Sequence, residues 1–274
     1  MDVKESLTSE QEKSVDEMVA ILRNWNGSFD MDSVAATLYI RWKIQFYRNL
    51  FCKYIDDESQ RMALGGNYHF TDTYLRLVDG VLADKEQSHW QVVCEDAYPA
   101  FKGKNACAYN MAMALVESHQ FLATNVSPDS SKWLWGDHHV NDYVNMPFSK
   151  TMLKPIFHRS VAVPGNDNTP NVSKLNLRKS RDDVVIKSAA SANFKMLIEL
   201  AKDPKDEVGL FSIDTGMNGH PFQGNYFDYN QDHLDGRLKP MKRGYQLEGT
   251  PVDTLVLKPR EKREANQADS STEL

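Results

Sequence analysis

The sequence predicts an α+β protein with a helical first half and antiparallel strands in its second half. Residues 9–122 carry apolar side chains mainly at helical spacing. Residues 158–213 instead carry several short β-branched or strand-like runs. A loop of Ser, Pro and Asp at 127–131 separates the two halves. Helices and strands in separate stretches of chain favour an α+β layout over a parallel α/β layout.

The expected helices follow from apolar periodicity and from residues that start or stop a helix. Ser9 or Ser14 can cap the first helix, and Asn26-Gly27 ends it. Asp32-Ser33 caps the second helix, which carries a broad apolar face. The predicted helices cover residues 9–25, 31–54, 70–83, 105–122 and, near the end of the chain, 225–235.

The expected strands are short runs bounded by turn-forming residues. The predicted strands cover residues 158–163, 183–188, 193–200 and 207–213, and 254–257 form a further strand-like run. The connection 164–176 is rich in Pro, Gly, Asn and Asp, which indicates a long loop. Residues 258–274 are charged and lack apolar periodicity, which predicts a disordered tail. The sequence therefore predicts one folded segment, 1–257, followed by this tail.

Composition excludes several function classes. The chain has 274 residues, 41 % of them apolar and 26 % charged, as in soluble globular proteins. The net charge of -6 and the lack of a basic stripe disfavour nucleic acid as a partner. No run approaches the about 18 apolar residues that a membrane-spanning helix needs. The first residues also lack the apolar segment of a signal peptide.

Three cysteines, Cys52, Cys94 and Cys107, occur without CxxC spacing. An odd number at these spacings is typical neither of a disulfide framework nor of a zinc site. We therefore expect three small, buried apolar residues.

The most informative stretch is 214–226, which reads Asp-Thr-Gly-Met-Asn-Gly-His-Pro-Phe-Gln-Gly-Asn-Tyr. It resembles the C-terminal signature of the penicillin amidase (penicillin acylase) family, Gly-Gln-Ser-Gly-x-Pro-x-Ser-x-x-Tyr. In that family an acidic and aromatic helix, a Gly and a Pro-Met pair follow. The matching positions here are Gly216, Gly219, Pro221, Tyr226 and Gly236. Both signature glycines before Pro221 are expected at backbone conformations or close approaches that a β-carbon would obstruct.

Four further blocks, in family order, carry the same resemblance. Residues 22–38 are similar to the family's Leu-x-x-Trp-Asp-Gly segment and the helix after it, with Trp25 anchoring the helix end and Gly27 supplying the turn. Residues 133–139, with Trp135, Gly136 and His139, resemble a Trp-x-Trp-Gly-x-x-His block, and Trp135 is expected to be buried beside the sheet. The remaining blocks are the loop 164–171 and the strand 191–200.

The chain also departs from the family pattern. Met217 and Asn218 replace the signature's Gln and Ser, and Gln223 replaces its second Ser. On the strand, Lys195 replaces an Arg and Glu199 replaces an Asp. An Arg-to-Lys change removes a planar fork of donors, so it is not neutral. The chain is therefore identified as a divergent member.

The resemblance implies the αββα fold of N-terminal-nucleophile hydrolases and the hydrolysis of linear amide bonds without a cofactor. Members use the side-chain oxygen of an N-terminal Ser, freed by self-cleavage, with its own α-amine as the base. That Ser, the oxyanion Asn and the active-site Arg lie upstream of the block at Leu22. We therefore expect no catalytic residue here, no activity of the chain alone, and the missing N-terminal part of the acylase as partner.

The residues leave the compartment, the acyl group and one alternative function open. Many family members are periplasmic or secreted, but these residues specify no compartment. Nor do they specify the acyl group, whether a penicillin side chain, a cephalosporin side chain or an acyl-homoserine lactone. The alternative function is a catalytically inactive remnant that acts as a binding or scaffold protein.

Other groupings of reactive side chains favour structural interpretations. Asp137, His138, His139 and Asp142 could form a metal site, but adjacent histidines on an extended chain face opposite ways, so a packed pair is favoured. Asp228, Asp232 and His233 could line one helix face, where a solvated face is favoured. Cys52 lies in an apolar helix pattern, typical of a buried thiol, and Gly27-Ser28 is interpreted as a turn.

Overall fold

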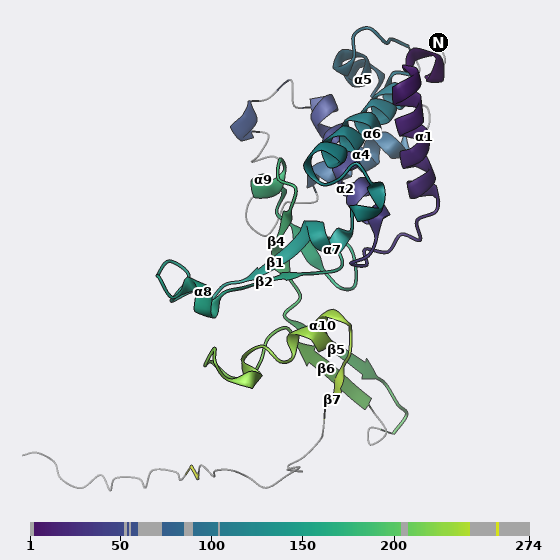
Figure 1. The fold of residues 1–274 in the computed structure, drawn as a ribbon. Helices are drawn as coiled ribbons and strands as arrows, with labels where there is room; N and C mark the ends of the chain where they lie inside the picture. The colour runs from purple at the N-terminus through teal and green to yellow at the C-terminus, as the bar shows by residue number, and fades with distance from the viewer. Residues whose placement is uncertain are drawn as a thin grey trace, which may run out of the picture.

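The fold is α+β, with a helical part followed by two separate sheets (Figure 1). The structure is a computed structural model. It describes residues 3–51, 54, 56–59, 73–84, 90–103, 105–203, 208–241 and 256–257. The predicted tail, 258–274, lies outside these residues, as do Cys52 and the start of the helix expected at 70–83.

The described residues of the helical part form both predicted and unpredicted helices. They are η1 (Lys4–Ser6), α1 (Ser9–Arg23), α2 (Val34–Phe51), α4 (Thr73–Ala83), α5 (Gln91–Ala97) and α6 (Ala106–Asn125). Among these described helices, η1 and α5 are absent from the predictions. Helix α2 packs against α1, α4, α5 and α6, and its apolar face is buried at Leu38, Ile44, Tyr47 and Leu50. The predicted helices at 9–25 and 105–122 are thus confirmed, and the helix predicted at 31–54 is confirmed over Val34–Phe51.

Local signals at the helix ends are partly as expected. Thr8, not Ser9 or Ser14, caps α1, because its hydroxyl accepts from the N–H of Gln11 while the Gln11 side chain accepts from the Thr8 N–H. Gly27 has a φ of 81° and so makes the turn that follows α1.

The expectation of three unpaired cysteines is wrong, because Cys94 on α5 is bonded to Cys107 on α6. Both cysteines are buried, and their Cα atoms lie 4.9 Å apart. The pairing depends on α5, which the sequence pattern does not reveal, packing along α6. A disulfide between them therefore joins two neighbouring helices.

A four-stranded sheet follows the helical part, in the order β2-β1-β4-β3. Its strands are β1 (His139–Tyr143), β2 (Arg159–Ala162), β3 (Ser173–Leu175) and β4 (Ile186–Ser191), and short helices α7 (Trp135–His138), α8 (Lys154–Phe157) and α9 (Leu177–Ser180) connect them, with η2 (Ser130–Lys132) before α7. The expectation of purely antiparallel strands is wrong here, because β1 pairs with β4 in parallel. The long connection through β2 and β3 returns the chain in the direction in which β1 runs.

Strand β4 begins three residues later than the predicted start at residue 183. Residues 183–185 are β-branched at Val184 and Val185, yet they lie in a bend before the strand. The guanidinium of Arg41, buried on α2, donates to the carbonyls of Asp183 and Val184, and also to that of Arg181. These carbonyls therefore satisfy a buried cation instead of a strand partner.

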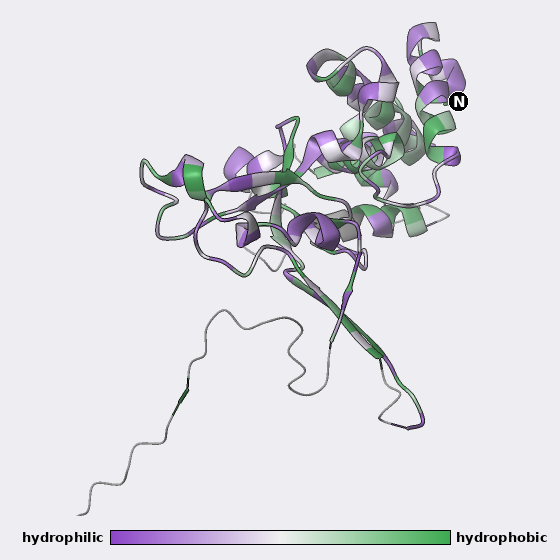
Figure 2. Cartoon of the chain, turned by 60° about the horizontal axis from the view of Figure 1, so that its bottom comes forward, coloured by the Kyte–Doolittle hydropathy of each residue, from purple (hydrophilic) through white to green (hydrophobic). Residues whose placement is uncertain are grey.

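The second sheet contains β5 (Phe194–Glu199), β6 (Val208–Ile213) and the short β7 (Lys239–Pro240), all antiparallel. The β5–β6 pair confirms the strands predicted at 193–200 and 207–213. Phe194, Met196 and Ile198 are about half exposed, and the apolar colouring of this hairpin is visible in Figure 2. The hairpin therefore presents apolar surface that no described residue covers.

The end of the described chain differs from its predictions. The helix expected at 225–235 is divided into η3 (Gly224–Tyr226) and α10 (Asn230–Leu234), with α10 beside β6. Val256 and Leu257 are exposed and lie in no strand, while the other residues of the run at 254–257 lie outside the described part.

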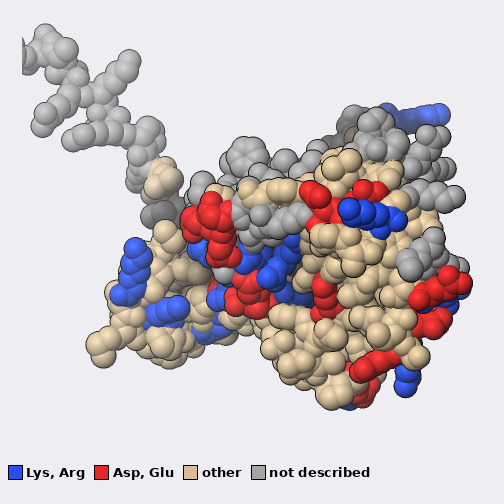
Figure 3. All heavy atoms as spheres, turned by 90° about the horizontal axis from the view of Figure 1, so that it is seen from above, with Lys and Arg blue, Asp and Glu red and all other residues tan. Residues whose placement is uncertain are grey.

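Charged groups of both signs are interspersed on the face drawn in Figure 3.

Candidate functional site

The signature segment leaves β6 at Ile213 and folds back on itself. The N–H of Gly216 donates to the carbonyl of Tyr226 at 3.0 Å, and the N–H of Asn218 donates to that of Asn225 at 3.1 Å. A β-carbon at Gly216 would lie 2.1 Å from the Asn225 oxygen, so the expected close approach is present there. The same expectation is wrong for Gly219, where a β-carbon would meet open space.

Tyr226 connects this folded loop to the four-stranded sheet. Its hydroxyl donates to the carbonyl of Phe157, at the end of α8, at 2.8 Å. The guanidinium carbon of Arg159, the first residue of β2, lies 5.6 Å from the centre of the Tyr226 ring. Segments about seventy positions apart in the sequence therefore meet at this tyrosine.

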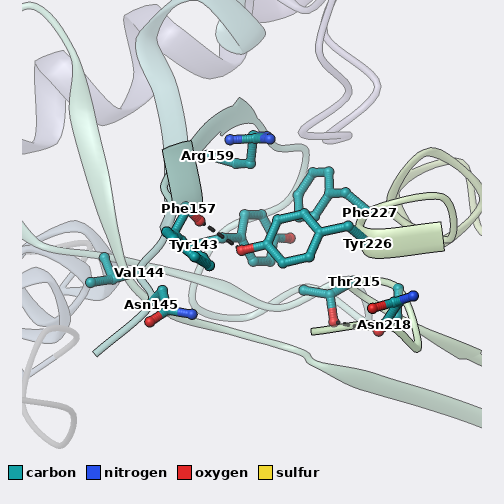
Figure 4. Close-up of a pocket in the computed structure, with 10 residues that line it drawn as sticks. Tyr143, Val144, Asn145, Phe157, Arg159, Thr215, Asn218, Tyr226 and Phe227 are labelled. Atoms are coloured by element: carbon teal, nitrogen blue, oxygen red, sulfur yellow. Dashed lines mark hydrogen bonds between the residues drawn. The ribbon is translucent and has the colours of Figure 1, made fainter. Parts of the chain in front are cut away.

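A cavity of about 240 Å³ lies where these segments meet (Figure 4). One wall comes from the end of β1 and the start of β2, and the other comes from the signature loop. Its lining includes Tyr143, Asn145, Arg159, Thr215, Asn218 and Tyr226. Tyr143 packs edge to face on Phe227, with ring centres 5.1 Å apart, so the walls are largely aromatic.

The polar groups of this cavity are few and differ in their surroundings. Nη1 of Arg159 donates to the carbonyls of Ile156 and His158, each at 2.9 Å. Oδ1 of Asn145 is buried and has no hydrogen-bond partner among the described residues. Burial raises the pKa of the Tyr143 phenol and of the neighbouring Asp214 carboxyl. The arrangement combines a few polar groups with aromatic walls, as sites for small organic molecules do.

The structure also contains a serine–histidine pair that sequence reasoning missed. Oγ of Ser212 lies 2.7 Å from Nδ1 of His233, whose Nε2 lies 2.7 Å from the carbonyl oxygen of Ala192. Because that carbonyl only accepts, Nε2 carries the proton, and Ser212 donates to Nδ1. Such a pair resembles an activated nucleophile, but Ser212 is 1 % exposed and His233 is 2 % exposed. No substrate reaches it in this conformation, so its role is to hold α10 on the sheet.

One prediction about α10 and the residues just before it is wrong in part. A solvated face was expected for Asp228, Asp232 and His233, and Asp228 is exposed while Asp232 pairs with Arg237 at 2.8 Å. His233 is buried instead, and burial lowers its pKa. Nζ of Lys195, the residue that replaces the family's Arg, donates to the carbonyl of His233 at 2.5 Å. The spacing of acidic and basic residues alone does not show that the His233 side chain is buried.

The Trp block forms a packed core beside the four-stranded sheet. Trp135 is fully buried, its Nε1 donates to the carbonyl of Gly165 at 3.0 Å, and its ring stacks on His139 at 4.5 Å. Nδ1 of His139 lies 3.0 Å from the Val163 oxygen, and burial lowers the pKa of His139 to about 4. A β-carbon at Gly136 would lie 3.0 Å from Cβ of Met31.

The metal hypothesis receives no support from this block. His138 is buried as well, Asp137 is exposed, and Asp142 pairs with Lys187 at 2.8 Å. Within the described ranges no three metal-binding side chains gather. The favoured interpretation of a packed histidine pair is confirmed, although His138 ends helix α7 and only His139 lies on an extended strand.

The signature positions Trp25, Gly27 and Gly236 lie at turns or in packed aromatic contacts. Nε1 of Trp25 donates to the carbonyl of Ser28 at 2.7 Å, across the Gly27 turn. The Trp25 ring centre lies 5.2 Å from the ring centres of Phe29 and Tyr39. Gly236 has a φ of 71°, the left-handed region that favours glycine.

In the part of the chain that the structure describes, no helix combines the length and apolarity needed to cross a membrane.

The model of the family described as penicillin amidase matches residues 2–246. No curated protein matches. A thermostable penicillin G acylase from Alcaligenes faecalis is similar at 13 % identity and a TM-score of 0.49, with 94 % of this chain and 45 % of that chain covered. The chain thus spans less than half the length of that acylase chain.

Proposed function

The chain belongs to the penicillin amidase family, and on that premise we propose that it is part of a hydrolase that cleaves linear carbon–nitrogen bonds of amides. The observation that carries the proposal is the family match, which extends over residues 2–246. The substrate is an acylated amine, and the products are a carboxylic acid and an amine.

The nucleophile is proposed to lie outside these 274 residues. Two considerations support this: the family's N-terminal Ser precedes the block at Leu22, and Ser212, the described serine with a histidine beside it, is buried. In the proposed reaction the serine oxygen attacks the amide carbon, and its own α-amine takes the hydroxyl proton and passes it to the leaving amine as the carbon–nitrogen bond breaks. Water then hydrolyses the acyl-serine and releases the carboxylic acid. An unperturbed α-amine has a pKa of about 8, so part of it is neutral and able to act as a base at physiological pH.

The present chain would then supply framework. We propose that the two sheets are parts of an αββα arrangement, with residues 1–257 as one segment and 258–274 as a tail. The half-exposed apolar side chains of β5 support this, because a sheet face of this kind is normally covered by another layer. The partner that would cover it is the upstream part of the acylase.

The test compares the 274-residue chain alone with the same chain joined to, or co-expressed with, the upstream part from its source. Both samples are given nitroanilides of several carboxylic acids, and release of nitroaniline is followed by absorbance. We expect turnover only when the upstream Ser is present. Turnover by the chain alone would contradict the proposed place of the nucleophile. No turnover of any amide by the complete protein would contradict the hydrolase.

A second candidate is a catalytically inactive binding protein, and the cavity beside Tyr226 favours it, since none of its described lining residues forms a nucleophile–base pair. The mass of the native protein in its source separates the two candidates. A compact species of about the 31.3 kDa of this chain favours the binding protein, whereas a larger processed product favours the hydrolase.

A further inference from the structure

We propose that the cavity between the β1–β2 strands and the signature loop binds a small organic carboxylate with an aromatic or apolar body, held by Arg159. This inference is separate from amide hydrolysis, because it requires no nucleophile and no reaction. It concerns the cavity of about 240 Å³ that Tyr143, Arg159, Thr215 and Tyr226 help to line.

The charge of the site comes from Arg159. No carboxylate of the described residues lies within 4.0 Å of its guanidinium, and no Asp or Glu belongs to the described lining of the cavity. Arg159 is half-buried, and two backbone carbonyls hold its Nη1. Its Nε and Nη2 have no acceptor among the described residues. A planar fork with free donors matches the two oxygens of a carboxylate.

Neutral polar groups and aromatic rings complete the site. Thr215 and Asn218 lie on the wall formed by the signature loop, opposite the strand residues, in Figure 4. Asn145 offers a buried oxygen without a donor, which suits a hydroxyl or N–H group of a ligand. The rings of Tyr143, Tyr226 and Phe227 supply the apolar surface. The ligand would thus have one anionic end and one apolar body.

The dimensions restrict the ligand further. About 240 Å³ lies just below the range of about 300–1,000 Å³ typical of drug-sized ligands. At the rim, Val144 is 44 % exposed, so an apolar body that extends outward would contact it. A single guanidinium without a second cation in the described lining favours a singly charged carboxylate over a polyphosphate.

Benzoate is the probe, and benzamide is its uncharged counterpart of nearly the same shape. Binding of each to the full protein is measured by ligand-observed NMR titration. We expect benzoate to bind about tenfold more tightly than benzamide, which corresponds to about 1.4 kcal/mol, because a hydrogen bond to a charged group is stronger than one to a neutral group. The substitution Arg159→Gln should remove this preference and leave benzamide unchanged.

Two further variants control the result. Arg23→Gln removes one positive charge from an exposed position on α1, away from the cavity, and should leave both affinities within about twofold. Val144→Trp fills the cavity from its rim and should weaken both ligands, and it keeps the test valid if Arg159→Gln does not fold. Equal affinity for benzoate and benzamide overturns the proposal. So does unchanged benzoate affinity in a folded Arg159→Gln or Val144→Trp protein, or no benzoate binding at all, which would leave the cavity to a side chain of another polypeptide.

Discussion

Breaking the Cys94–Cys107 disulfide should lower stability by an amount that the structure defines. The two cysteines are 13 positions apart, on α5 and α6. The chain-entropy relation for a closed loop of about 14 residues gives about 3 kcal/mol at 25 °C. For a chain of this length, about 3 kcal/mol corresponds to a fall in Tm of about 6–12 °C. The variant Cys94→Ala/Cys107→Ala keeps both positions apolar and therefore isolates the loss of the bond.

The assay is thermal and urea unfolding of both proteins with and without dithiothreitol. Reductant should lower the Tm of the native sequence and leave the double variant unchanged. Titration of the unfolded native protein with a thiol reagent should find one reactive thiol of the three cysteines. Three reactive thiols in material never exposed to reductant would refute the pairing. A double variant that melts within about 1 °C of the native protein would refute the entropic magnitude.

Three further predictions concern packing, pH and surface. Gly216→Ala should lower the free energy of unfolding by about 2 kcal/mol or more, measured in urea, because its β-carbon meets backbone; Gly219→Ala, in open space, should change it by less than about 0.5 kcal/mol. His139 has a folded pKa of about 4, below its unfolded value of about 6.5. The unfolded state therefore binds the proton first, and about 3 kcal/mol of stability present above pH 6.5 should be lost as the pH falls to 4; a His139→Phe protein whose urea midpoint falls equally over this range would contradict it. The chain purified alone should be poorly soluble, and Met196→Lys/Ile198→Lys on the exposed β5 should raise its soluble fraction; a monomeric native chain that melts cooperatively would show that this surface is no liability.

Local chemistry predicted the parts of the fold whose cause is local. Apolar spacing located α1, α2 and α6, because a helix that buries one face must repeat apolar residues every three to four positions. The strands of the β5–β6 hairpin were predicted because each is a short strand-like run in the sequence. Strand β1 was not visible, because the run from His139 to Tyr143 contains one β-branched residue, and partners β2 and β4 define it.

The site depended on contacts that no local pattern records. Its cavity joins the end of β1 to the loop after β6, and Arg159 lies in a strand whose sequence gives no sign of a binding role. Likewise, Ser212 and His233 meet only because α10 turns inward onto β6. The disulfide has the same explanation, since Cys94 and Cys107 come together through helix packing. Side-chain pairs between distant segments therefore escaped prediction wherever tertiary packing alone brings them together.

In the signature segment, the residues that keep the family pattern hold the loop together, whereas residues that depart from the pattern lie at the cavity or are exposed. Gly216 and Tyr226 keep the family pattern, and they carry the backbone contact that closes the loop and the hydrogen bond to the carbonyl of Phe157. Met217 and Asn218 depart from the pattern, and Asn218 lines the cavity while Met217 is 76 % exposed beside it. A substitution at Asn218 changes the groups that the cavity presents to a ligand, and it leaves Tyr226, which anchors the loop, in place. The divergence of this chain therefore falls where it would change a ligand more than the fold.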